Sequence, residues 1–280
     1  MPPIQLEKAV KYASWSGWRG IVLEEWQELF SSIDDWLGSP SQLILDLPCR
    51  RIVRHDTQKG IVYSKLMWAQ NDGAIQKKEI FSWLKWALGP QRALHIWDVS
   101  RRMMECGHLC AEPVLAVRKL SVNLRHLNLL VTKEVTSPTV ESIVLAGGKE
   151  AENAVISAGK CLALLHGDKF LHGDYLPRNT CLQNGKIVFL DNDKSSHWNF
   201  MPPFFLRRRN LDQFAYNLLV LSGLDSYRDA LSLAFIDAYC QEAKLAPAPI
   251  SAKVMAKAKK RWEHKASTQS GVASASRAGK

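Results

Sequence analysis

The segment from Leu165 to Asp193, "LHGDKFLHGDYLPRNTCLQNGKIVFLDND", constrains the fold of this chain more than any other part of it. It places His172, Asp174 and Asn179 in the pattern H-x-D-x-x-x-x-N, inside a stretch too polar to be a continuous strand or helix. We therefore expect a loop that gathers a carboxylate and an amide. The alternative is that His172 is a core histidine and that the Asp and Asn side chains only cap turns.

A β-hairpin is predicted directly after this loop. Asn184-Gly185 is the dipeptide most typical of a two-residue hairpin turn, and the apolar run "IVFL" ends at Asp191. Such a hairpin would bring Asp191 beside Asn179. Asp193 is either a further ligand in the same site or a solvated loop residue.

These residue types suit phosphoryl transfer. The reaction needs a carboxylate that orients the attacking hydroxyl, oxygen ligands for Mg²⁺, and a cation over the nucleotide phosphates. Asp174 would face the acceptor hydroxyl, and Asn179 and Asp191 would hold the metal. The cation is expected upstream, where Lys65 follows the alternating residues "GIVYS". A lysine at that position is otherwise a solvated edge residue.

Composition narrows the class of protein. The chain has 280 residues, of which 46% are hydrophobic, and it contains no apolar run of the ~18 residues that a spanning helix requires. The N-terminal residues lack the apolar core of a secretory signal, so a cytoplasmic location is expected. Six cysteines without a C-x-x-C pair suggest neither a zinc site nor a disulfide framework.

The net charge of +10 indicates attraction to polyanions. Arginine forks suit phosphate and carboxylate groups, so Arg207, Arg208 and Arg209 are candidate acceptor-binding residues; a solvated charge run is the alternative. The basic stretch Lys253–Lys265 is either a peripheral contact with an anionic membrane or a solvated terminal helix. No nucleic-acid-binding motif accompanies the charge, so specific nucleic-acid binding is not expected.

Hydrophobic periodicity predicts an α+β chain. Residues 4–37 are predicted to be helical, residues 50–68 to form a hairpin, and residues 113–120 and 125–135 to form strands. From about Ser137 the pattern is mainly helical. The predicted organisation is an N-terminal helical extension (1–40), a small lobe (41–134), a larger helical lobe (135–264) and a disordered tail (265–280).

Four pieces of the sequence carry a family resemblance: "HGDYLPRN", "FLDND", "IVYSK" and "QRALHIW…CGHLCAEPVLA". Together they resemble the lipopolysaccharide kinase family, which comprises Kdo kinase and the inner-core heptose kinases within the protein-kinase-like superfamily. The likeness spans about residues 50–220. It implies a bilobal α+β fold, with a small N-terminal sheet-plus-helix lobe and a larger helical C-terminal lobe. It also implies an enzyme that uses ATP and Mg²⁺ and a saccharide or lipopolysaccharide acceptor.

The resemblance implies a role for each matching residue. Asp174 resembles the catalytic base, and Lys65 resembles the lysine that contacts the nucleotide. Asn179 and Asp191 resemble the magnesium ligands. Lys133 and Glu134 fall where the adenine-binding hinge is expected, through backbone groups. His172 and Asp212 resemble residues that support the site structurally.

Two departures from the family pattern leave alternatives open. The loop "HDTQKG" has a single glycine, Gly60, where a glycine-rich phosphate cover is usual. The acidic partner of Lys65 does not follow from the motif: Asp98 and Glu105 are available, and Glu79, on the preceding segment, is the residue chosen. A nucleotide-binding pseudokinase is therefore one alternative. A small-molecule kinase of the aminoglycoside or choline type is another, because its loop has the form HGD-x-x-x-x-N.

Overall fold

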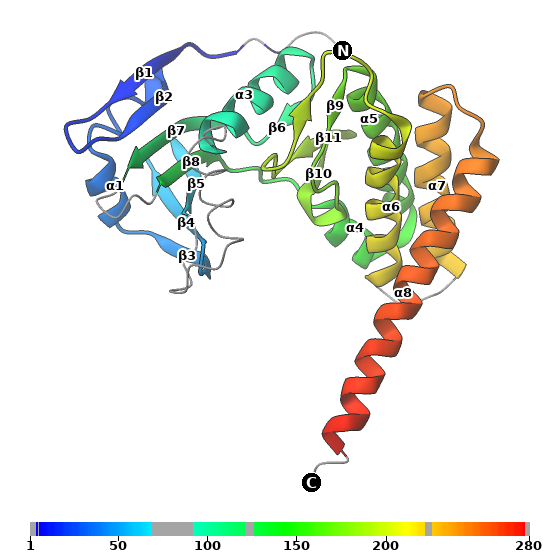
Figure 1. The fold of residues 1–280 in the computed structure, drawn as a ribbon. Coiled ribbons are helices and arrows are strands. Elements are labelled where there is room, and N and C mark those ends of the chain that lie inside the picture. Colours follow the sequence, from blue (N-terminus) through cyan, green and yellow to red (C-terminus); the bar gives the residue numbers. More distant parts are fainter. Residues whose placement is uncertain (1–3, 5, 69–91, 121–125, 222–225, 278–280) are drawn as a thin grey trace, which may run out of the picture. The chain divides into compact units, whose positions relative to one another are not determined.

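The computed structural model describes residues 4, 6–68, 92–120, 126–221 and 226–277 (Figure 1). The chain divides into two compact units, residues 1–135 (unit 1) and 136–280 (unit 2). The division falls one residue after the lobe boundary predicted from the sequence.

Unit 1 is built on an antiparallel sheet, which in the described residues has seven strands in the order β1-β2-β7-β8-β5-β4-β3. The helix α3 (Arg92–Glu105) packs against β7 and β8. The strands are β1 (Ala9–Ala13), β2 (Arg19–Leu23), β3 (Gln42–Leu47), β4 (Arg50–Thr57), β5 (Gly60–Met67), β7 (Pro113–Leu120) and β8 (His126–Lys133). A short strand, β6 (Leu109–Cys110), follows α3.

The helix predicted over residues 4–37 is wrong. The segment forms the β1–β2 hairpin, a 3-10 turn η1 (Glu24–Trp26) and the short helix α1 (Ile33–Gly38). A β-carbon on Gly20 would lie 2.0 Å from the Ala116 carbonyl oxygen, so only glycine lets β2 approach β7 this closely. The N-terminal residues are therefore part of the sheet of unit 1.

Tryptophans explain why this N-terminal segment stays on the sheet. Trp18, Trp26 and Trp36 are buried in the core of unit 1, where they meet residues from β2, β5, β7 and β8. The Trp36 indole nitrogen donates to the Ser64 hydroxyl at 2.9 Å, which satisfies its one polar atom inside the core. The tryptophan content thus reflects burial between sheet and N-terminal segment.

The predicted strands of the small lobe are confirmed. Strands β4 and β5 form a hairpin in which Thr57 faces Gly60, and Gly60 adopts φ +107, where glycine is favoured. Strands β7 and β8 occupy the two other predicted positions.

Unit 2 is mainly helical, as expected. Its helices are α4 (Val140–Ala146), α5 (Gly148–Gly167), α6 (Phe204–Val220), α7 (Ser226–Glu242) and α8 (Pro247–Arg277). Its short extended and 3-10 elements are β9 (Phe170–Leu171), η2 (Pro177–Asn179), β10 (Thr180–Gln183), β11 (Lys186–Phe189) and β12 (Ser196–His197). Both Gly147 and Gly148 have φ +77, which separates α4 from α5.

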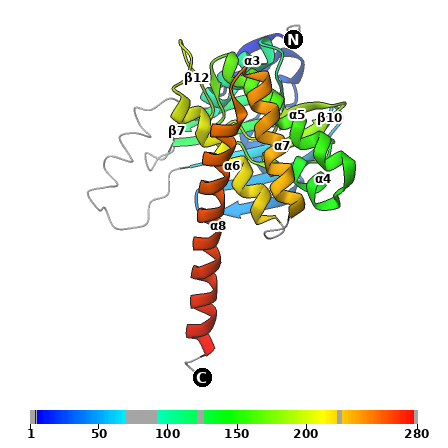
Figure 2. The same ribbon diagram turned by 90° about the vertical axis from the view of Figure 1, so that its right-hand side faces the viewer.

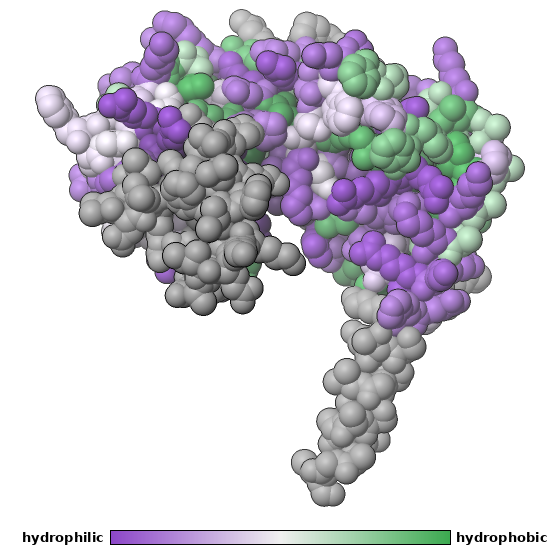
Figure 3. All heavy atoms as spheres, in the orientation of Figure 1, coloured by the Kyte–Doolittle hydropathy of each residue, from purple (hydrophilic) through white to green (hydrophobic). Residues whose placement is uncertain are grey.

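Helix α8 packs along α6 and α7 through its first turns. Val254, Met255 and Ala258 are buried there. The helix continues to Arg277, past residue 265, where the sequence predicted a disordered tail, and its last turns extend beyond the ends of α6 and α7 (Figure 2). On the face drawn in Figure 3, most exposed side chains are hydrophilic, with hydrophobic ones among them.

We predict that Gly159→Ala destabilises unit 2 by about 1–3 kcal/mol, because a β-carbon there would lie 2.3 Å from the Phe235 carbonyl oxygen of α7. Gly167→Ala is the matched control, since no atom lies within 4 Å of its β-carbon position. Urea unfolding of both variants tests the prediction. Equal midpoints for the two variants would show that α5 and α7 do not pack this closely.

Candidate active site

Two segments of unit 2 lie side by side and together build the site. Strands β9 and β12 pair antiparallel, with Leu171 opposite Ser196. The chain entering the H-x-D-x-x-x-x-N loop therefore runs beside the chain leaving the "FLDND" segment. A β-carbon on Gly173 would lie 1.9 Å from the Lys194 β-carbon, so this approach requires glycine between His172 and Asp174.

The predicted β10–β11 hairpin is confirmed. Asn184 (φ +49) and Gly185 (φ +75) form its two-residue turn, and both have the positive φ values that a type I′ turn requires. The Leu190 N–H donates to the Asn179 carbonyl at 3.0 Å. Asp191, the next residue, is therefore brought beside Asn179 as the sequence predicted.

The oxygen atoms gathered here suit a magnesium ion. The Asn179 amide nitrogen donates to the Asp174 carbonyl at 3.0 Å, which leaves the amide oxygen as an acceptor. Asp191 supplies a carboxylate, and its Oδ1 accepts from the Asp193 N–H at 3.2 Å. Hard oxygen donors of this kind fit Mg²⁺, which takes few protein ligands when nucleotide phosphates supply the others. Within the described residues, no three His, Cys, Asp or Glu side chains cluster as a self-sufficient metal site.

Asp174 is accessible and lies against a lysine that the sequence analysis did not single out. Its side chain is 32% exposed, and Oδ2 accepts from the Lys194 ammonium at 2.8 Å. Lys194 itself is 61% exposed. The carboxylate is thus held from one side by a cation and remains open to solvent. Lys194 directly follows the "FLDND" segment, which is the signal that could have identified it.

His172 is buried beneath the loop. Its ring packs on Phe189, with ring centroids 5.3 Å apart, and edge-on against Tyr175 at 5.7 Å. Burial lowers the pKa of His172 to about 4, although the negative charges of Asp191 and Asp174 act in the opposite direction. The imidazole is therefore neutral at pH 7 and lies buried under the loop that carries Asp174.

Asn210 on α6 holds the loop backbone and was missed by the sequence analysis. Its amide nitrogen donates to the His172 carbonyl at 2.6 Å, and its amide oxygen lies 3.0 Å from His166 Nε2. The other ring nitrogen of His166 lies 2.9 Å from the Tyr239 hydroxyl. These bonds connect α5, α6 and α7 to the loop. These hydrogen bonds join residues far apart in the sequence, so no local sequence pattern predicts them.

Asp212, expected to steady the loop backbone, pairs with side chains of the helices. It accepts from Lys257 of α8, and Arg208 Nε lies 3.6 Å from its Oδ1. The hydrogen bond to the loop carbonyl comes instead from Asn210, one half-turn earlier on α6. In this structure Asp212 therefore connects α6 to α8.

The three arginines at the start of α6 have different surroundings. Arg207 Nε donates to the Pro202 carbonyl at 3.0 Å, and its guanidinium lies 5.5 Å from the Phe204 ring centre. Arg208 lies beside Asp212, while Arg209 is exposed. Of the predicted acceptor-binding residues, Arg209 is thus the one whose side chain faces solvent.

The nucleotide-binding candidates lie in unit 1. Lys65 is half-buried on β5, between β4 and β8, with Ile52 and Leu130 as its strand partners. This central position differs from the edge position considered as an alternative. The candidate partners Asp98 and Glu105 are exposed on α3, and Glu79 lies outside the described residues.

Lys133 ends β8 and Glu134 follows it, next to the point in the sequence where the units divide. The Lys133 N–H donates to the Glu112 carbonyl at 2.8 Å, and the Glu134 N–H donates to the Ile61 carbonyl at 3.0 Å. Both N–H groups are therefore occupied within unit 1. An adenine contact here would use their carbonyl groups or the N–H groups of the residues that follow.

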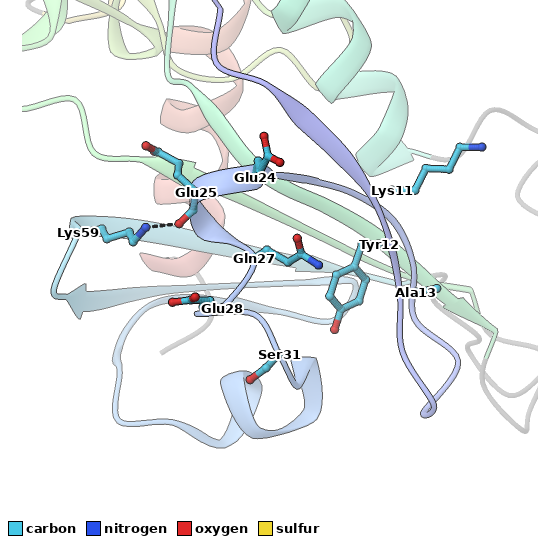
Figure 4. A pocket seen from close by; sticks show the side chains of 9 residues that line it. All are labelled: Lys11, Tyr12, Ala13, Glu24, Glu25, Gln27, Glu28, Ser31 and Lys59. Carbon is cyan, nitrogen blue, oxygen red and sulfur yellow. Dashed lines mark hydrogen bonds between the residues drawn. The ribbon is translucent and has the colours of Figure 1, made fainter.

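A hollow of about 670 Å³ in unit 1 is lined by the side chains drawn in Figure 4. Three of them are Glu24, Glu25 and Glu28, and Lys59 donates to the Glu25 carbonyl. With Lys11 and Lys59 also in the lining, the three carboxylates leave a formal charge of about −1, which does not favour phosphate groups.

No family model and no curated protein matches the chain. Solved structures do match. A structure of WaaP in complex with acyl carrier protein is 18% identical, with a TM-score of 0.59, and the match covers 85% of this chain and 96% of that one. The bifunctional kinase-methyltransferase WbdD is 14% identical, with a TM-score of 0.44 over 71% of this chain and 43% of that one.

The WaaP match shows the fold. The expected α+β, protein-kinase-like fold, with an N-terminal antiparallel sheet and a larger helical part, is confirmed. Across the portions of the chain that the structure describes, no helix combines the length and apolar character needed to cross a bilayer.

We predict that stability falls as the pH drops from about 6.5 toward 4. Burial also lowers the pKa of His166 to about 4, so His166 and His172 are neutral when folded and protonate more readily when unfolded. As the pH falls, the unfolded state therefore binds protons before the folded state does. This lowers the free energy of unfolding by roughly 3 kcal/mol per histidine between pH 6.5 and 4.

Urea unfolding at several pH values measures this slope. His166→Gln is expected to make the slope shallower, whereas His264→Gln, a change at an exposed position on α8, is expected to leave it unchanged. Identical slopes for the wild type and both variants would contradict the proposed origin.

Proposed function

We propose that this chain is a kinase that transfers the γ-phosphate of ATP to a sugar hydroxyl of a lipopolysaccharide core, on Kdo or heptose. The observation that carries the proposal is that Asp174, Asn179 and Asp191 lie on two neighbouring segments of unit 2, which strands β9 and β12 pair together. A partly exposed carboxylate beside two oxygen ligands supplies two of the three kinds of group that phosphoryl transfer requires.

In this proposal Asp174 accepts a hydrogen bond from the acceptor hydroxyl and orients it for in-line attack on the phosphate. Asn179 and Asp191 would hold Mg²⁺, which when bound supplies positive charge to the nucleotide phosphates. His172 remains neutral and adds no charge beneath the loop. These roles follow from contacts inside unit 2 alone.

Unit 1 is proposed to supply the nucleotide contacts. Lys65 would reach the phosphates from β5, a central strand, and the segment at Lys133 and Glu134 would meet the adenine. The donor ATP is consistent with the cytoplasmic location proposed for the chain.

The acceptor class rests on two supports. The motifs resemble the lipopolysaccharide kinase family, and the fold is shared with WaaP. Core saccharides carry phosphate and carboxylate groups, which the exposed guanidinium of Arg209 suits.

We predict that wild-type protein transfers labelled phosphate from ATP to extracted lipopolysaccharide core in the presence of Mg²⁺. Asp174→Ala is expected to lower the rate by at least ~100-fold, because it removes the group that orients the hydroxyl. Glu152→Gln, a change to an exposed carboxylate on α5, is the matched control and is expected to leave the rate unchanged.

The other outcomes each favour a named alternative. Transfer only to a panel of small hydroxyl compounds would favour an aminoglycoside- or choline-type kinase. Magnesium-dependent nucleotide binding with no labelled product from any acceptor would favour the pseudokinase. If Asp174→Ala transferred phosphate at the wild-type rate, the proposed role of Asp174 would be wrong.

A second prediction concerns Lys194. An exposed ion pair contributes little to stability, so Lys194→Met is expected to change the unfolding free energy by less than about 0.5 kcal/mol. The same variant is expected to slow transfer at least ~10-fold, because Asp174 loses the cation that fixes its orientation. Lys194→Arg, which keeps the charge, should recover part of the rate. A stable variant with unchanged transfer would show that the pair has no part in the reaction.

A further inference from the structure

Large hydrophobic side chains are concentrated on one exposed stretch of unit 2. Ten such side chains are exposed in the described residues, and four of them lie within the six residues 200–205: Phe200, Met201, Phe204 and Phe205. Phe205 is 71% exposed and Phe200 62%. A contiguous group of this kind on a protein surface marks an interaction site, whereas single exposed apolar residues do not.

The backbone beneath these side chains is held in place. The Trp198 N–H donates to the Lys169 carbonyl at 2.9 Å, and the Trp198 ring meets Phe200 edge-on at 5.6 Å. At the other end, Arg207 bonds the Pro202 carbonyl and its guanidinium lies over Phe204. Residues 198–209, named here the aromatic segment, thus present their rings from a fixed backbone, which lowers the entropic cost of binding.

The surroundings of the aromatic segment are basic. From Lys194 to Leu211 the chain carries four Lys and Arg residues and no acidic residue, and two of the four lie beside acids outside this range, Lys194 at Asp174 and Arg208 at Asp212. Arg209 is exposed, and the exposed Lys169 donates to the Asn199 carbonyl at 3.3 Å. Asp168, next to Lys169, is the exposed acid at this end of α5. The partner that fits is therefore one with an apolar interior beneath a negatively charged surface.

The basic stretch at residues 253–265 does not offer the same combination. Its apolar residues Val254, Met255 and Ala258 are buried against α6 and α7, and Lys257 is paired with Asp212. Among the described side chains of residues 253–264, Trp262 is the one large apolar residue that is not buried. The membrane contact considered for that stretch from the sequence is better suited to the aromatic segment.

We propose that the aromatic segment docks on an anionic lipid bilayer. Phe200, Met201, Phe204 and Phe205 enter the interfacial region, where aromatic rings are favoured, and Arg209 and Lys169 meet the headgroup phosphates. Each cation near an anionic surface adds to the attraction, so binding depends on both anionic lipid and salt.

This docking deepens the proposed function in one respect. Ser196, at the start of β12, pairs beside the loop that carries Asp174, so a docked aromatic segment keeps that loop near the membrane surface. The acceptor would then be a lipid-linked saccharide. This last step rests on the proposed kinase activity, whereas the docking itself does not.

The test is co-sedimentation of the full-length protein with vesicles. One set contains phosphatidylcholine alone, and the other also contains about one-third phosphatidylglycerol. The wild type is expected to bind the anionic set and to be released near 1 M salt, where the screening length is ~3 Å.

Two variants and two matched controls locate the contact. The double variant Phe200→Ser/Phe205→Ser and the single variant Arg209→Glu are each expected to weaken binding about tenfold or more. The controls are Leu43→Ser/Ile44→Ser, on two exposed apolar residues of β3, and Lys253→Glu, which makes the same charge change on α8. Both controls are expected to bind as the wild type does.

Absence of binding to anionic vesicles at low salt overturns the proposal, and so does equal loss of binding in the variants and their controls. The kinase proposal is judged separately, by transfer to a water-soluble sugar acceptor, which the double variant should perform as well as the wild type. Transfer without vesicle binding would overturn docking alone. Vesicle binding without transfer to any acceptor would overturn the kinase proposal alone.

Discussion

The close approach of Gly173 to the backbone of Lys194 is the constraint on which the site depends. Because residue 173 has no side chain, the segment around Gly173 contacts the segment around Lys194. The pairing of β9 with β12 fixes their register. The loop with Asp174 and the loop with Asp191 thereby share one location. The same approach places Lys194 at the Asp174 carboxylate. A single glycine thus sets the separation of the two segments that carry Asp174 and Asp191.

Helices α5 and α6 hold the loop that carries Asp174 in place through hydrogen bonds. The Tyr175 hydroxyl donates to the Ala158 carbonyl of α5 at 2.7 Å, while Asn210 bonds the His172 carbonyl from α6. His172 fills the space under the loop as a neutral ring. Exposed Asp174 and Lys194 therefore stand on a rigid, buried base, which is the arrangement that preorganised catalysis requires.

Local signals account for the parts of the molecule that the sequence predicts well. The Asn184-Gly185 turn specifies the β10–β11 hairpin from two residues, and the position of Asp191 follows from strand length alone. The helix predicted over residues 4–37 is wrong because the packing of this segment is set by the sheet. Trp18, Trp26 and Trp36 are buried against the sheet, and the Gly17 turn between β1 and β2 is the local signal for a hairpin.

Contacts between distant residues account for what the sequence could not provide. Asn210 and His166 are separated by the whole site region, and their hydrogen bond exists only once α5 and α6 pack together. The pairing of Asp212 with Lys257 likewise depends on the course of α8. A motif identifies which residue types are present, but the choice between two nearby polar residues on α6 requires the packed structure.

Calorimetric titration with ATP tests whether Asn179 and Asp191 hold magnesium together with a nucleotide. We expect Mg²⁺ to strengthen ATP binding to the wild type, and we expect Asp191→Asn to abolish this dependence while weak metal-free binding persists. Magnesium-dependent binding of equal strength in Asp191→Asn would show that the nucleotide and its metal lie elsewhere.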